Sequence, residues 1–141
     1  MPVASAYTKD NIINTLLRGV PFPVPPNSFL SLHTGDPGDT GANEAALAQW
    51  PSYVRKDANN GAGMGKGWSE STGGQGLSQN TNQILWPSQN GGGVVQIGFF
   101  GVWDAATGGK FLLGAPLYAP KQLNPGDVFV FVVQSLAVRE L

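Results

Sequence analysis

The sequence contains no cysteine and only one histidine, His33, among its 141 residues. The lack of cysteine excludes disulfides, thiolate metal ligands and thiol nucleophiles. With a single histidine, a zinc site would need carboxylates for its other ligands, and a serine triad would need His33 as its base. A lone histidine at the end of a strand is more typical of a hydrogen bond to the backbone. We therefore predict no catalytic residue, no metal site and no cofactor.

Charged residues are also scarce, at 12% of the chain, and the formal net charge is −1. Without a basic field we expect no nucleic-acid partner. No apolar run approaches the roughly 20 residues of a membrane-spanning helix, so we expect no membrane partner. A surface with few charges protects poorly against self-association, which is typical of an assembly subunit. The alternative is that low charge and 20 glycines simply reflect many β-turns.

Residues 8–19 have the pattern of a short amphipathic helix. Thr8 is a candidate N-cap, and Gly19 follows the last periodic residue as a candidate helix end. The aliphatic residues between them form one stripe: Ile12, Ile13, Leu16 and Leu17. Such a stripe normally packs on the core of its own domain, and we favour that outcome. The alternative is docking on a neighbouring subunit, with Ile12 and Leu16 as candidate contacts.

A proline-rich segment follows at residues 20–26, and its prolines exclude helix and favour an extended connector. Phe22 and Val24 alternate in this segment and are candidate contacts for a groove on a partner. A strut that lies across the domain's own surface is the use that we favour. The helix and this segment together form an N-terminal arm, residues 1–27, ahead of a β-rich domain, residues 28–141.

From residue 28 onward the sequence has the pattern of a single β domain. Strand-like segments alternate with Gly- and Pro-rich turns, at residues 29–34, 53–55, 83–86, 94–103, 110–117, 127–133 and 135–139. We predict a mainly β fold, a single antiparallel β-sandwich with one short N-terminal helix and a long Gly-rich loop. Residues 128–133 are apolar on both faces, so this strand is expected either to be covered on both sides or to have one face in a subunit interface.

The long loop spans residues 57–79 and has seven glycines between Gly61 and Gly76. Structureless loops beyond about 12–15 residues in a compact domain are usually functional or mobile. Met64 and Trp68 are the candidate contacts for a neighbour in this loop, and the isolated tryptophan is the stronger anchor. A dispensable surface insertion is the alternative.

A dense set of turn formers follows the first predicted strand, at residues 35–41. Asp36, Asp39 and Glu44 offer oxygen ligands near it, but their spacing is not that of an EF-hand. A turn in which the Asp36 carboxylate caps nearby backbone N–H groups is the simpler explanation. We predict that this region is a structural turn motif, made of His33, Asp36, Pro37, Gly38, Asn43 and Glu44.

The run from Leu30 to Glu44, LSLHTGDPGDTGANE, resembles a signature of small tailed-phage virion proteins labelled tail fibre, head fibre or capsid decoration proteins. Later segments agree with that family in order, at residues 53–55, 100–109, 114–117 and 125–127. The resemblance spans about residues 28 to 140 and implies a small β-sandwich without catalytic residues. The loop 57–79 and the proline-rich segment depart from the family pattern.

This resemblance implies a structural protein that is made in the host cytoplasm and located in the virion. Our preferred hypothesis is a capsid decoration, or cement, protein on the capsid surface. It would form a homotrimer, bind the major capsid protein or other virion proteins, and bridge capsomers through two extended segments, residues 20–28 and 57–79. The alternative is a tail-fibre or baseplate component involved in host attachment.

Overall fold

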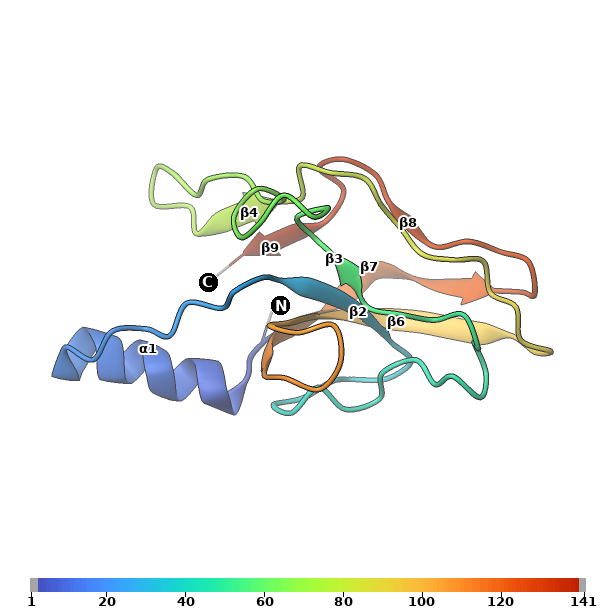
Figure 1. Cartoon of the computed structure of the whole chain (residues 1–141), viewed down its shortest axis with the longest axis horizontal. Coiled ribbons are helices and arrows are strands. Elements are labelled where there is room, and N and C mark those ends of the chain that lie inside the picture. The colour runs from blue at the N-terminus through green and yellow to red at the C-terminus, as the bar shows by residue number, and fades with distance from the viewer. Residues whose placement is uncertain (1–2, 140–141) are drawn as a thin grey trace.

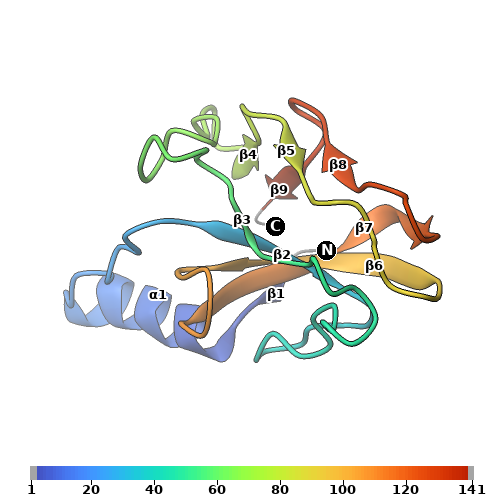
Figure 2. The ribbon, with the colours of Figure 1, turned by 45° about the vertical axis from the view of Figure 1, so that its right-hand side comes forward.

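The structure is a computed structural model that describes residues 3–139 (Figure 1, Figure 2). It is mainly β with antiparallel sheets and one N-terminal helix, which confirms the predicted fold class. The elements in chain order are β1 (Val3–Ala4), α1 (Ala6–Arg18), β2 (Phe29–His33), β3 (Lys56–Asp57), β4 (Leu77–Gln79), β5 (Ile84–Leu85), β6 (Val95–Trp103), β7 (Phe111–Leu123), β8 (Val130–Phe131) and β9 (Ala137–Arg139).

The larger layer is a five-stranded sheet in the order β1-β7-β6-β2-β3. Its centre is the long hairpin of β6 and β7, in which Val95 pairs with Leu123 and Trp103 pairs with Phe111. β6 begins with alternating burial because successive side chains of a strand point to opposite faces. The hairpin pairs with β1 through β7 and with β2 through β6, so it organises the whole larger sheet.

The second layer consists of two short antiparallel ribbons, β4 with β9 and β5 with β8. Figure 2 shows these ribbons facing the larger sheet across the interior. Trp86, next to β5, meets the rings of Phe129 and Phe131 nearly edge-on, at centroid distances of 5.6 and 5.7 Å. Edge-on aromatic pairs add to the free energy gained by burying their apolar area. The core between the layers therefore stabilises the fold without disulfides.

The apolar run at residues 128–133 is less covered than predicted. Phe129 and Phe131 are only 4% and 7% exposed, whereas Val130 and Val132 are 38% and 55% exposed. Of the two alternatives, coverage on both faces is wrong, because among the described residues β8 pairs only with β5 and one face alone reaches the core. The valine face stays open, which keeps the other alternative, an interface, as a hypothesis.

The glycine-rich loop is tied to the rest of the chain and ends in β4. The fully buried Asn59 donates from Nδ2 to Ser28 Oγ at 3.1 Å and accepts the N–H of Gly67 at 2.8 Å. Trp68 packs partly buried against the core, and its Nε1 donates to Ser28 Oγ at 3.0 Å. Trp68, a candidate contact for a neighbour, thus also contributes to the chain's own fold.

Two further buried amides hold other irregular segments. Asn80 Oδ1 accepts the N–H of Leu136 at 2.9 Å, and its Nδ2 donates to the carbonyl of Val132 at 2.9 Å. Gln89 Nε2 donates to the carbonyl of Leu123 at 3.3 Å. Buried polar groups cost free energy unless they are hydrogen-bonded, and here each amide bonds backbone groups of a segment distant in sequence.

Candidate assembly surface

The N-terminal helix begins earlier than predicted, because its N-cap is Ser5 and not Thr8. Ser5 Oγ accepts the N–H of Thr8 at 3.1 Å, which satisfies one of the N–H groups left free at a helix start. At the other end Gly19 has φ 68°, and its N–H bonds to the carbonyl of Asn14. A left-handed glycine ends the helix where the sequence predicted it.

The helix turns its polar face inward and its apolar face outward. Thr8 is buried, and Asn11 and Thr15 are half-buried. The exposed fractions of the aliphatic side chains are 39% for Ile12, 54% for Ile13, 72% for Leu16 and 77% for Leu17. The prediction that this stripe packs on the domain's own core is wrong. This helix exposes its apolar face and buries its polar one, the reverse of a helix that packs only on its own domain. We call it an inverted helix.

Backbone and polar contacts attach the helix at its first turn. β1 pairs with β7, Ala4 opposite Leu113, and the N–H of Ser5 donates to the carbonyl of Leu112 at 2.9 Å. Lys9 Nζ lies 2.9 Å from Asp39 Oδ1 in an exposed ion pair, a type of contact that contributes about 0–1 kcal/mol. Beyond this turn the helix extends away from the sheet toward one end of the molecule (Figure 1).

The proline-rich segment continues the exposed apolar surface. It runs back beside α1 toward β2 (Figure 1, Figure 2). Phe22 is half-buried, whereas Val24 is 75% exposed, so the segment lies against the molecule on one side only. We define the arm surface by its exposed aliphatic side chains: Ile12, Ile13, Leu16, Leu17, Val20 and Val24. Contiguous apolar patches on soluble proteins often mark sites of protein contact.

The turn motif is organised around a largely buried ion pair between Glu44 and Arg55. Arg55 donates from Nε to Oε2 and from Nη2 to Oε1 of Glu44, each at 2.9 Å, and the Tyr53 hydroxyl donates to Oε2 at 2.7 Å. Burial alone would raise the pKa of Glu44, but these hydrogen bonds keep that pKa below its ordinary value. The guanidinium carbon lies 3.6 Å from the Trp103 ring centroid.

The predicted strand at residues 53–55 has no strand partner, and β3 begins one residue later.

The other motif residues close the turn. Asp36 Oδ1 accepts the N–H of Gly38 at 2.8 Å, and Asn43 Nδ2 donates to the carbonyl of Asp36 at 2.9 Å. Pro37 is buried within this turn, and its ring lies close enough to Gly114 of β7 that a side chain there would clash. Within residues 3–139, no three acidic or histidine side chains gather as a metal site would require.

His33 and Ser31 have the contact of a nucleophile and its base, but not the surroundings. The Ser31 hydroxyl donates to His33 Nε2 at 2.6 Å, and Trp103 Nε1 donates to Ser31 Oγ at 2.9 Å. His33 Nδ1 donates to the backbone carbonyl of Ala42 at 2.7 Å, where a triad would place a carboxylate. Both Ser31 and His33 are 0% exposed, so no substrate reaches the hydroxyl. The pair connects β2 to the turn motif.

This arrangement predicts that stability falls when the pH is lowered below about 6.5. Burial lowers the pKa of His33, although the Ala42 hydrogen bond and the Glu44 charge oppose the shift. The unfolded chain, with an ordinary histidine pKa near 6.5, therefore binds a proton more readily than the folded chain. The contribution of His33 is complete above pH 6.5 and decreases below it, by at most about 1.4 kcal/mol per pH unit.

Urea unfolding at pH 7.5 and pH 5.0 measures this loss directly. His33→Asn, which keeps a donor near the Ala42 carbonyl, serves as the control. Its free energy of unfolding should differ less between the two pH values than that of the unmodified chain. An unchanged or larger free energy of unfolding at pH 5.0 in the unmodified chain would show that His33 does not resist protonation.

The structure leaves Ile12, Leu16 and Val24 exposed on the arm, at 39%, 72% and 75%. It leaves Met64, which is 41% exposed, in the glycine-rich loop that Figure 1 shows near β4. No helix among the described residues is long and apolar enough to cross a bilayer. The sequence pattern revealed the aliphatic stripe, but not that it faces outward.

Comparison with known proteins identifies the family. No curated protein matches the chain. Residues 3–139 match the family model Gp80, described as podophage GP4 fiber I protein gp80. The match covers nearly the whole chain and favours the fibre alternative over capsid cement. It also agrees with a structural rather than an enzymatic role for the Ser31–His33 pair. The chain belongs to the family of the podophage GP4 fiber I protein gp80, a phage fibre protein and structural component of the virion.

Proposed function

We propose that this protein is a fibre subunit that joins the other proteins of the virion through its arm surface. The observation that carries the proposal is the inverted helix, because Leu16 and Leu17 are 72% and 77% exposed while Thr8 is buried. A helix packed only for its own fold would expose the threonine and bury the leucines.

The energetics support an assembly role for this arrangement. Fully burying an aliphatic side chain contributes roughly 1.5–3 kcal/mol, and the isolated chain forgoes most of that contribution along its arm surface. Covering all six side chains at once would contribute more free energy than a single weak contact supplies. Part of that gain offsets the entropy lost on association. A partner that covers the arm would therefore recover free energy that folding leaves unused.

The small domain behind the arm fits a building block better than a catalyst. Its one buried Ser–His pair has no access to solvent, and its best-connected charges, Glu44 and Arg55, hydrogen-bond each other. The cement role that we preferred from the sequence alone requires many copies over the capsid surface. A fibre subunit would instead be confined to the fibres and present in fewer copies.

Labelling of purified virions with an antibody against this chain tests the proposal. Electron microscopy of negatively stained particles should show gold on fibres, and gel densitometry should show far fewer copies than of the major capsid protein. Gold spread over the whole head, with a copy number close to that of the capsid protein, would contradict the fibre proposal and restore the cement hypothesis.

A further inference from the structure

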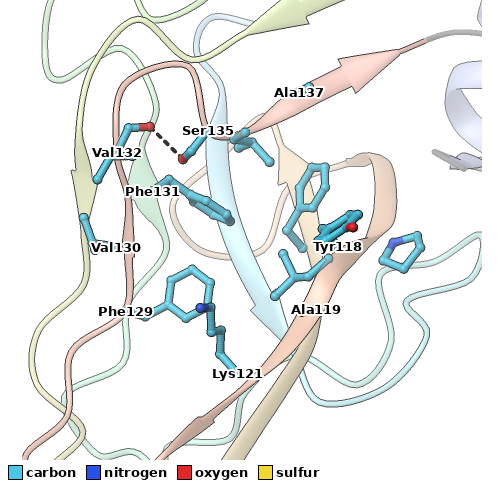
Figure 3. Close-up of a pocket in the computed structure, with 13 residues that line it drawn as sticks. Tyr118, Ala119, Lys121, Phe129, Val130, Phe131, Val132, Ser135 and Ala137 are labelled. Atoms are coloured by element: carbon cyan, nitrogen blue, oxygen red, sulfur yellow. Dashed lines mark hydrogen bonds between the residues drawn. The ribbon is translucent and has the colours of Figure 1, made fainter.

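A groove of about 440 Å³ lies between β7 and the segment that contains β8 and the start of β9. Figure 3 shows Phe129 and Phe131 on one side of it, Tyr118 and Ala119 of β7 on the other, and the Lys121 side chain of β7 beside Phe129. Val130 and Val132 add exposed apolar surface to the β8 side. Lys121 is the only charged side chain among the described residues that line the groove.

The outer edge of β7 beside the groove is only briefly covered. β1 pairs with β7 at Leu113 and Gly114 alone, so the rest of that edge, from Ala115 to Leu123, has no strand beside it among the described residues. Pro116 and Pro120 lie in this stretch and have no N–H to donate. An added strand would therefore pair poorly there, and a helix in the groove is the better fit.

We propose that this groove receives the arm surface of a second copy of the chain. The inference rests on the proposed function and names the partner of the arm. The exposed ridge of Leu16 and Leu17 is convex, whereas the apolar groove is concave, so the two surfaces complement each other. A contact between two arms would leave the groove uncovered, and a contact between two grooves would leave the arm uncovered.

The charges at the two surfaces are also complementary. Among the described charged residues of α1, Lys9 is paired with Asp39, and Arg18 at the end of the helix donates to Asn14 Oδ1 at 3.2 Å. Asp10 is the one acidic group of the helix and lies beside the ridge. Asp10 precedes Ile13 by three residues and Leu17 by seven, a spacing that places it on the same side of the helix. In the contact that we propose, Asp10 of one copy lies near Lys121 of the next.

The positions of the two surfaces make the contact head-to-tail. In both overall views α1 lies at one end of the molecule and β8 lies toward the other (Figure 1, Figure 2). Two different patches that bind each other form a heterologous interface, which either closes into a ring or continues as a filament. Both results are compatible with a fibre.

Cysteine cross-linking of the full-length chain tests this contact against a background without native cysteines. Leu17→Cys places a thiol on the arm, Val132→Cys places one in the groove, and Gln75→Cys is an exposed control in the glycine-rich loop. Under mild oxidation, the mixture of the Leu17 and Val132 variants should give at least tenfold more disulfide-linked dimer than the mixture of the Leu17 and Gln75 variants.

Two results would overturn the inference. Dimer at the control level in the Leu17 and Val132 mixture would show that the arm does not enter the groove. If the Leu17→Cys variant alone gave as much disulfide-linked dimer as its mixture with the Val132→Cys variant, the arms would pack against each other. Neither result bears on whether the arm is needed in the virion, because that is measured separately by incorporation of arm variants into particles.

Discussion

Replacing Arg55 with alanine should lower the free energy of unfolding by about 3–5 kcal/mol, the range typical of removing one partner from a buried ion pair. Arg55 is 9% exposed and Glu44 is 22% exposed at their side chains. The substitution leaves the Glu44 carboxylate with the Tyr53 hydroxyl as its remaining side-chain donor. It also removes the donor that Arg55 provides to the carbonyls of Ala105 and Gly108.

Urea unfolding followed by circular dichroism gives the free energy for this variant. Arg18→Ala is the matched control, because Arg18 is exposed at the end of α1 and its loss should change stability by no more than about 0.5 kcal/mol. A loss of less than about 1 kcal/mol in Arg55→Ala would show that the turn motif does not depend on this ion pair.

The second large effect is expected in assembly rather than in folding. The double substitution Leu16→Lys/Leu17→Lys places two charges on the arm surface, which a covering partner would have to desolvate without a counter-charge. We expect incorporation of the variant into phage particles to fall at least tenfold, as measured by immunoblot of purified virions that carry the variant in place of the unmodified chain.

Thr72→Lys/Gln75→Lys is the control, because it adds the same charge at exposed positions of the glycine-rich loop. That variant should be incorporated at the level of the unmodified chain. Equal incorporation of both double variants would mean that the arm surface makes no contact in the particle.

The strands with strong local signals could be predicted from the sequence. The segments 29–34 and 94–103 correspond closely to β2 and β6, because alternating side chains and flanking turn residues mark both. β7 continues to Leu123, beyond the predicted end at Leu117. Pro116 and Pro120 are tolerated in this continuation, because the register with β6 shifts there and no described strand pairs with the outer edge.

The features that depend on distant contacts could not be predicted. Periodicity identified the aliphatic stripe of α1, but a hydrophobic pattern does not say whether the chain itself or a partner covers that face. The buried amides Asn59, Asn80 and Gln89 stand among polar residues of ordinary turn composition, so no local signal distinguishes them. The contact of Trp68 with Ser28 joins residues 40 positions apart.

The central claim is that the apolar face of α1 serves assembly and not folding. The most direct measurement is the free energy of unfolding of the purified Leu16→Lys/Leu17→Lys chain, from urea titration beside the unmodified chain. We predict a difference of no more than about 0.5 kcal/mol, because both side chains are exposed in the isolated subunit. A loss of several kcal/mol, as expected for charges forced into a core, would contradict the claim.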